Sequence, residues 1–327
     1  MKATKIISAC AVLVALASCS NDHVISQPGA EDTPIRIQAN VGAVTTKAAS
    51  DIQSEHFKDG QTVNVYIYEH TTGTEGYKYG SNSDGHVPCT VNSNKLNPTG
   101  GVTLFYPANG NGIDVYGVYP STVTANASSQ NFTVGDNQSL EDDYMASDLM
   151  FTDTQVSDHK KTAGDVSLVF KHKLSKVIVI LQKGSGLNAS DIDGATVKIT
   201  NTIRQCTIAS VGKSGMGNVD VSTSDAASPI TIGTWNSSST SNGIAAIVVP
   251  QVVLANSQLF QVELTNNAVY KYYIPSTGNV TFSPEKVYTY TLTLTTAGIN
   301  VTSSITNWTD DTNSLPGGNG NGDANLD

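Results

Sequence analysis

Short runs in which apolar and polar side chains alternate constrain the fold of this chain more than any other feature. In 35–41 and 62–68 an apolar residue returns at every second position, which is the period of a half-buried β-strand. Gly, Asn, Ser and Pro punctuate the segments between the runs, and no helical period intervenes. The pattern predicts an all-β fold of packed antiparallel sheets with little helix.

The two halves of the chain each carry a set of expected strands. In the first half we predict strands at 35–41, 62–68, 102–106, 113–119 and 131–134. In the second half we predict them at 166–170, 174–182, 196–200, 205–209, 244–249, 259–264, 270–274, 287–295 and 299–308. The run at 177–181 is apolar at every position and predicts a central strand covered on both faces.

The length of 327 residues exceeds the usual size of a single hydrophobic core. A long irregular region at 121–162 separates the two sets of strands, and we place the domain boundary there. The expected organisation is a lipoprotein signal peptide at 1–18, a flexible spacer at 19–34, an N-terminal β-sandwich domain at 35–162, a C-terminal β-sandwich domain at 163–311 and a disordered tail at 312–327.

The first nineteen residues have the pattern of a bacterial lipoprotein export signal. Lys2 and Lys5 precede a short apolar run at 6–17, and small residues lead directly to Cys19. We predict cleavage before Cys19 and acylation of its thiol with palmitate-type chains, which would tether the mature protein to a membrane. The alternative is an ordinary signal peptide that contains a cysteine. No later run approaches the ~20 apolar residues of a membrane-spanning helix.

The charge of the chain limits the classes of partner that it can bind, and its cysteines limit the disulfides that it can form. The formal net charge is −10 and the chain has no run of Lys or Arg, which argues against nucleic acid as a partner. Cys89 and Cys206 are the thiols left outside the export signal. Neither has a Cys-x-x-Cys neighbour, so we expect two buried free thiols, with a disulfide between them as the alternative.

The sequence shows no convincing catalytic or metal-binding pattern, so we predict no enzyme, no cofactor and no metal site. The histidines lack metal-ligand spacing, and His172 is interpreted as a structural or surface residue. The acidic cluster at 141–143 reads as a solvated loop, with half of a carboxylate pair or a calcium loop as alternatives. The tyrosines at 66, 68 and 270–273 are interpreted as strand-face packing, with a sugar-stacking platform as the alternative.

A set of ordered motifs gives the chain a family resemblance. It resembles the fimbrillin family of Bacteroidales lipoprotein pilins, the subunits of type V pili. The motifs are the lipobox at Cys19, Phe57-x-Asp59-Gly60, Asp148-Leu149-Met150, the segment 168–177, Ile247-Val248-Val249-Pro250-Gln251, Phe282-x-Pro284-x-Lys286-x-Tyr288-x-Tyr290 and Ile305-Thr306-Asn307-Trp308. Their order and spacing cover nearly the whole chain after the export signal.

The resemblance implies two tandem transthyretin-like β-sandwich domains and assembly by strand exchange. It also implies that an Arg-specific protease cuts after the first strand and discards the lipid with that strand. Removing a strand exposes unpaired backbone groups beside an apolar groove, which an extended segment of another subunit can refill.

Mapped onto this sequence, the cut falls at Lys47-Ala48, where the basic residue is Lys and not Arg. The displaced strand has Ile35, Ile37, Ala39 and Val41 as its groove-filling residues. The donor strand is 299–308, in which Ile299, Val301 and Ile305 share one face. The alternative is that 299–308 completes its own domain, because an acidic tail rich in Gly and Asn follows it.

We therefore predict a structural fimbrial subunit, or an accessory, tip or anchor fimbrillin, that serves adhesion at the outer membrane and cell surface. Its partners would be other fimbrial subunits, the outer membrane through the lipid anchor, and a host glycan or protein ligand. The alternative function is a cell-surface lipoprotein that binds glycan or host ligand without polymerising.

Overall fold

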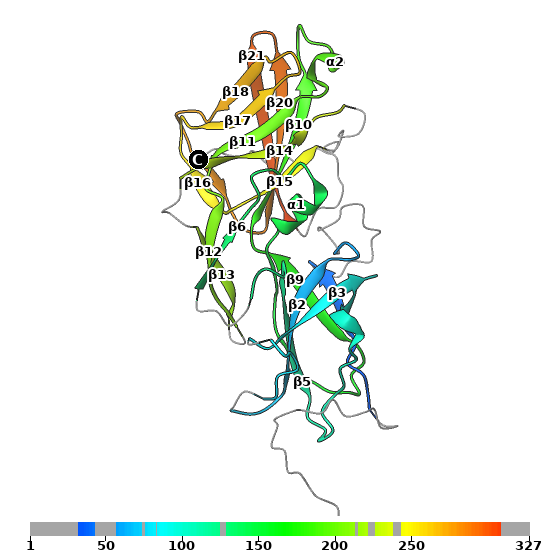
Figure 1. The fold of residues 1–327 in the computed structure, drawn as a ribbon. Helices are drawn as coiled ribbons and strands as arrows, with labels where there is room; N and C mark the ends of the chain where they lie inside the picture. Colours follow the sequence, from blue (N-terminus) through cyan, green and yellow to red (C-terminus); the bar gives the residue numbers. More distant parts are fainter. Residues whose placement is uncertain are drawn as a thin grey trace, which may run out of the picture. The chain divides into compact units, whose positions relative to one another are not determined.

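The computed structural model describes residues 32–42, 57–73, 76–82, 84–124, 129–212, 215–221, 226–237 and 243–308. Strands dominate these residues (Figure 1), as the alternating pattern predicts. The helical elements are short: η1 (Thr99–Gly101), α1 (Glu141–Ala146) and α2 (Ala189–Ile192). The all-β fold class is confirmed.

The largest sheet has eight strands and contains the first strand of the chain. In spatial order it comprises β2 (Thr62–Glu69), β3 (His86–Asn92), β4 (Lys95–Pro98), β1 (Ile37–Val41), β9 (Val166–His172), β7 (Met150–Thr152), β5 (Ile113–Tyr119) and β8 (Val156–His159). β2 also pairs with β5. A closed ring is therefore formed by β2, β3, β4, β1, β9, β7 and β5, and β8 is added to it through β5. A closed ring leaves no free edge among its members.

Two four-stranded sheets make up most of the second half. One contains β15 (Ile244–Val248), β10 (Ser175–Lys183), β20 (Lys286–Thr295) and β21 (Gly298–Asn307). The other contains β14 (Ser228–Thr234), β11 (Thr196–Thr202), β17 (Gln258–Glu263) and β18 (Val269–Tyr273). Their apolar residues share one core, in which the rings of Phe260 and Tyr290 meet edge to face at 4.8 Å. This is the packing of a β-sandwich.

Two smaller sheets complete the fold. β6 (Ser129–Thr133), β12 (Gln205–Gly212) and β13 (Gly215–Val221) form one of them, and β16 (Gln251–Val253) and β19 (Val280–Phe282) form the other. Most ladders are antiparallel, but β1 runs parallel to β9 and β10 runs parallel to β20. β10 lies between β15 and β20, which confirms the central strand predicted at 177–181.

Hydrogen bonding crosses the domain boundary that the sequence analysis places at residue 162. β9 follows that boundary but pairs with β1 and β7, and β6 precedes it but pairs with β12. The division into two domains stays a prediction. Local sequence patterns do not reveal that strands of one half pair with strands of the other half.

The expected strand at 102–106 is wrong. Phe105 forms only an isolated bridge with Pro34, and η1 immediately precedes the segment. Gly100 and Gly101 both have positive φ, so the backbone turns there. Val102 is already extended, but the segment bonds to Thr33 and Ile35 around the isolated bridge without forming a strand ladder. The region expected to be irregular at 121–162 also contains α1, β7 and β8 in addition to β6.

Candidate functional site

The first strand lies inside the eight-stranded sheet, with a neighbour on each side. Ile37 to Val41 pair in parallel with Val166 to Phe170 of β9, and Ile37 and Gln38 pair antiparallel with Leu96 and Lys95 of β4. Backbone bonds fix its two ends, because Val166 N donates to Arg36 O and Gly42 N donates to Phe170 O, both at 2.8 Å. We call the space that β1 occupies between β4 and β9 the β1 groove.

The inward side of β1 is apolar and closely covered. Ile37, Ala39 and Val41 are 4%, 0% and 3% exposed, while Gln38 between them is exposed. All three belong to the core that fills the ring, together with Leu168 and Phe170 of β9. The prediction that these residues share a buried face is confirmed for positions 37, 39 and 41.

The polar side of β1 is tied to β9 by side chains. Gln38 Nε2 donates to Asp165 Oδ2 at 2.9 Å, and Asn40 Nδ2 donates to Ser167 Oγ at 3.3 Å. Both bonds are solvent-exposed, so each contributes less than a buried hydrogen bond. β1 is therefore held chiefly by its backbone ladders and its three buried side chains.

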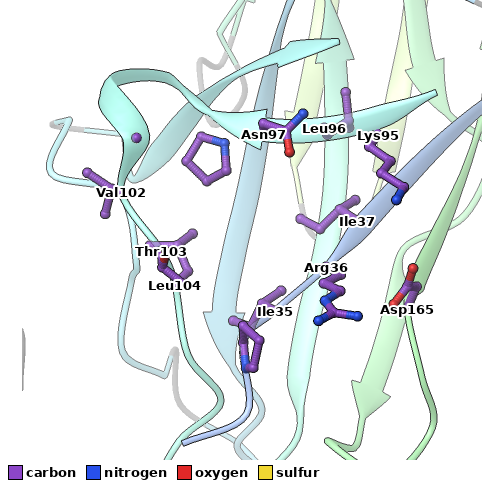
Figure 2. A pocket seen from close by; sticks show the side chains of 13 residues that line it. Ile35, Arg36, Ile37, Lys95, Leu96, Asn97, Val102, Thr103, Leu104 and Asp165 are labelled. Atoms are coloured by element: carbon purple, nitrogen blue, oxygen red, sulfur yellow. The ribbon is translucent and has the colours of Figure 1, made fainter. Parts of the chain in front are cut away.

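The beginning of β1 borders an open hollow of about 400 Å³. Figure 2 shows Ile35, Arg36 and Ile37 on one side of it, with Lys95 to Asn97 of β4 and the segment 102–104 around it. Ile35 is only partly buried and lies outside β1, where its N donates to Leu104 O at 2.8 Å. The strand is therefore less well packed at its start than at its centre.

The predicted donor strand is integral to its own sheet in this structure. β21 pairs with β20 from Gly298 through Asn307, at the edge of that sheet. Ile299 and Val301 are partly buried against the core, and Ile305 is 49% exposed. No charged residue occurs in Gly298–Asn307. Edge strands usually carry charge or Pro that discourages pairing with other chains, and β21 lacks both.

β21 is followed directly by a buried aromatic contact that was not expected from the sequence. Trp308 is 1% exposed, and its ring lies parallel to that of His172, with centroids 3.8 Å apart and planes at 4°. Nδ1 of His172 lies 3.0 Å from the carboxylate of Asp148. His172 is thus a buried structural residue inside β9, and not a residue between strands as its sequence position suggested.

Cys19, Lys47 and Ala48 lie outside the described residues. Lipidation at Cys19 and proteolysis at Lys47-Ala48 therefore stay predictions from the sequence. Cys89 and Cys206 are buried and unbridged, which confirms the interpretation of free thiols. Burial raises the pKa of each thiol to about 12, so both stay protonated at neutral pH.

The other sequence candidates have structural explanations. Tyr66 and Tyr116 are fully buried and stacked, with centroids 4.8 Å apart, so Tyr66 packs on a strand face as predicted. Glu141 to Asp143 form the first turn of α1, not a loop, and Glu141 pairs with Lys58 at 2.8 Å. Acidic side chains are favourable in the first turn of a helix.

Neither metal-binding nor membrane-spanning features occur in the described ranges. Among those residues, no group of three His, Cys, Asp or Glu side chains is placed to hold a metal ion. The helices present there are too short and too polar to traverse a bilayer. The arrangement with the clearest potential for interaction is the β1 groove, because a β-strand there is enclosed by two backbone edges and an apolar core.

Comparison with known proteins identifies relatives over almost the whole chain. A fimbrillin-like family profile matches residues 46–308. The chain is 27% identical over 316 residues to a Bacteroides uniformis protein named "Putative fimbrium subunit Fim1C", covering 94% of this chain and 96% of the relative.

Solved structures share the fold at lower identity. A crystal structure described as a "putative cell adhesion protein" from Bacteroides uniformis matches with a TM-score of 0.63 and 20% identity, over 86% of this chain and all of the other. A second so described, from Bacteroides ovatus, matches with a TM-score of 0.58 and 14% identity, over 85% and 98%. The family resemblance seen in the sequence motifs is confirmed: the chain belongs to the fimbrillin-like family.

Proposed function

We propose that this protein is a structural subunit of a surface fimbrium that assembles by strand exchange, with β1 as the strand that is replaced. The observation that carries the proposal is the position of β1 between β4 and β9. Departure of a strand from this position exposes two backbone edges and an apolar core, which favours the entry of another strand in its place. Family membership and the fimbrial relative support the same role.

The energetics favour replacement over an empty groove. Burial of an Ile or Val side chain stabilises by about 1.5–3 kcal/mol, and Ile37 and Val41 are both nearly fully buried. Opening the groove forfeits this gain and leaves the N–H and C=O groups of β4 and β9 without their partners. An incoming strand with small or apolar residues at alternate positions restores both contributions.

The donor in this proposal is the segment 299–308 of another copy. Ile299, Val301 and Ile305 lie on one side of β21, as the filling of an apolar groove requires. The absence of charge in β21 suits it to a groove that holds Ile37, Ala39 and Val41 of β1 in the intact chain and is lined by apolar residues such as Leu168 and Phe170. Donation requires that β21 separate from β20 along ten register pairs, so the strand that replaces β1 also leaves a position in its own sheet.

The proposed route to the surface begins with lipidation of Cys19 and anchoring in the outer membrane. Cleavage between Lys47 and Ala48 would then separate β1 from the rest of the chain. A cleaved subunit would be able to accept a donor strand in its β1 groove, whereas an uncleaved subunit would retain β1 and its lipid.

The test is a version of the full chain in which residues around Lys47 are replaced by the recognition sequence of a site-specific protease. A fluorescent peptide of residues 298–308 is added before and after cleavage. We expect binding by fluorescence anisotropy only after cleavage, and growth of oligomers by light scattering on prolonged incubation. The control peptide carries Asp at positions 299 and 301, and we expect it to bind at least tenfold more weakly because Asp cannot enter an apolar groove without cost.

A second preparation removes the uncertainty about whether the cut fragment dissociates. A chain that begins at Ala48 lacks β1 altogether and is tested with the same two peptides. Strand exchange is ruled out if this chain folds, stays monomeric and does not discriminate between the peptides.

A second candidate function, adhesion to a glycan, is supported by exposed aromatic rings. Tyr77 and Tyr273 are 46% and 53% exposed, and Tyr77 meets Tyr79 edge to face at 5.4 Å. Aromatic faces at a surface are suited to stacking against sugars. Binding to a glycan array that is lost in Tyr77→Ala or Tyr273→Ala, while oligomer formation is retained, would assign adhesion to these side chains.

A further inference from the structure

We propose that β9 couples β1, the strand that is replaced, to β21, the strand that is donated. Removal of β1 from its groove would then loosen the attachment of β21 in the same molecule. This inference rests on the proposed function, because it concerns when a subunit can release the strand that it donates. It is carried by a continuous set of contacts that runs from β1 through β9 to Trp308.

The first step concerns what holds β21 in place. Along Gly298–Asn307 every side chain is exposed or only partly buried, and Ile305 is 49% exposed. The residue that follows, Trp308, is 1% exposed. The strand is thus retained by its ladder to β20, by the partial burial of Ile299 and Val301, and by one buried indole just after its end, which is its largest apolar anchor.

The second step concerns the surroundings of that indole. The Trp308 ring stacks on His172 of β9, which belongs to the ring of strands that contains β1 and not to the sheet of β21. The backbone N of Trp308 donates to Glu285 O at 2.9 Å, and Glu285 N donates to the O of Leu174, which lies just after β9, also at 2.9 Å. The end of β21 is therefore attached to the end of β9 through both a side chain and the backbone.

The third step concerns the support of β9 itself. β1 pairs with Val166 to Phe170, whereas β7 pairs only with Phe170 to His172. When β1 leaves, the first half of β9 has no strand ladder, although Val169 O still accepts a bond from Asp153 N. His172 lies two positions beyond Phe170, the last residue that β1 supports, so loosening of β9 reaches the stacked ring directly.

The imidazole of His172 is also held at its edge by Asp148, whose carboxylate lies 3.0 Å from Nδ1. Both side chains are almost completely buried. A small displacement of β9 therefore disturbs a buried polar contact and the aromatic stack together, and neither is compensated by water. The β1 groove and the end of β21 are thus linked through β9, whose position depends on both.

The consequence is an order of events. A subunit whose groove is filled by its own β1 holds β21 firmly, and a subunit whose β1 has been removed holds it loosely. Because coupling free energies are reciprocal, weakening the Trp308 contact must also loosen β1. A merely structural role for Trp308 would not produce that second effect.

The experiment is hydrogen–deuterium exchange of the full-length chain, read by mass spectrometry in peptides that cover β1, β21 and β17. Ala39→Arg places a charge at a position that is 0% exposed and disrupts β1. Gln38→Arg changes the exposed neighbour and serves as its matched control. We expect Ala39→Arg to raise exchange at least tenfold in both β1 and β21 and to leave β17 unchanged, and Gln38→Arg to change none of them.

The reciprocal arm uses Trp308→Ala, with Trp308→Phe to preserve a stacking ring and Trp235→Ala as a second buried indole away from this contact. We expect Trp308→Ala to accelerate exchange in β1, Trp308→Phe to restore most of the protection, and Trp235→Ala to leave β1 protected. If Ala39→Arg prevents folding, Ile37→Ala replaces it, since it removes apolar contacts from the same strand without adding charge.

The coupling is overturned if β1 exchanges faster in the groove variants while β21 does not, or if Trp308→Ala affects β21 alone. Neither readout requires oligomers, so the coupling can fail while strand exchange between subunits still occurs. Conversely, a coupled monomer that never binds the 298–308 peptide would refute the proposed function and leave the coupling intact.

Discussion

The side chain of Gln138 forms two hydrogen bonds with the backbone of Ile247. Its Nε2 donates to Ile247 O at 2.9 Å, and Ile247 N donates to its Oε1 at 2.7 Å. The backbone N of Gln138 also donates to Thr231 O of β14 at 2.8 Å. Gln138 therefore occupies the backbone groups of Ile247 on the edge of β15 and also binds β14, so another chain cannot pair with β15 at Ile247.

The first prediction concerns the two bonds between Gln138 and Ile247. Gln138→Ala leaves the N–H and C=O of Ile247 buried without partners, and we expect a loss of about 2–4 kcal/mol in the free energy of unfolding. Urea denaturation followed by circular dichroism measures it. Ser139→Ala, at the exposed neighbouring residue, should change stability by less than about 0.5 kcal/mol. Equal midpoints for the two variants would contradict the role of Gln138.

The second prediction concerns the packing of β5 against β9. A Cβ added at Gly117 would lie 2.5 Å from Cζ of Phe170, so we expect Gly117→Ala to cost about 1–3 kcal/mol through overpacking. Adding Phe170→Leu to Gly117→Ala should recover part of that loss, with a coupling energy of about 0.5–3 kcal/mol in a double-mutant cycle. Gly233→Ala is the control, because its added Cβ would make only ordinary contact with Ile244 at 3.8 Å. Strict additivity of the two changes would refute the contact.

The third prediction concerns the buried thiols. Burial raises the pKa of Cys89 and of Cys206 from 9.0 to about 12, so neither forms the reactive thiolate at pH 8. We expect both to resist alkylation by iodoacetamide in the folded protein and to react fully in urea, as followed by peptide mapping. Because the unfolded thiols ionise first, the folded state should lose stability as the pH rises from about 9 towards 12. Rapid labelling of either thiol at pH 8 without denaturant would contradict this.

The fourth prediction concerns Asp84. Burial alone would raise the pKa of its carboxyl, but hydrogen bonds from the Tyr66 hydroxyl at 2.8 Å and from His86 outweigh burial, and the pKa is lowered from 3.8. A lowered folded-state pKa gives stability that is present above about pH 3.8 and lost as the pH falls through the folded value.

We therefore expect Asp84→Asn to cost about 0.5–1 kcal/mol at pH 7, a value kept small by solvent screening. The difference from the unmodified protein should vanish in strong acid, as measured by denaturation at a series of pH values. Asp142→Asn, at a carboxylate whose side chain is 93% exposed, is the control and should leave the free energy of unfolding at pH 7 nearly unchanged. A constant difference for Asp84→Asn across the series would exclude the ionic origin.

Local alternation predicted the long strands well. The expected strand at 113–119 has the bounds of β5, and that at 62–68 is one residue shorter than β2. Several strands were missed, and two of them have weak local signals. β3 is interrupted by Pro88, and β4 has one buried residue, Leu96, between two exposed ones. Their positions are determined by the neighbours with which they pair, and not by their own composition.

The candidate site was predicted only in part, for the same reason. The buried face of β1 follows from its alternation, but its neighbours do not, because β9 lies far along the chain and runs parallel to it. The stack of Trp308 on His172 likewise joins distant segments. A polar strand-end residue such as His172 looks exposed in the sequence, and only tertiary packing shows that Asp148 and Trp308 enclose it.

The mixed pairing of β1 has a consequence for the polarity of any filament built through its groove. β1 runs antiparallel to β4 and parallel to β9. A replacement strand inserted head first or tail first would still meet one neighbour running its own way and one running the opposite way. Backbone hydrogen bonding therefore does not determine the direction in which the replacement strand inserts. In a fibre whose subunits all point the same way, that direction would have to be set by the sizes of the side chains that fit the apolar side of the groove.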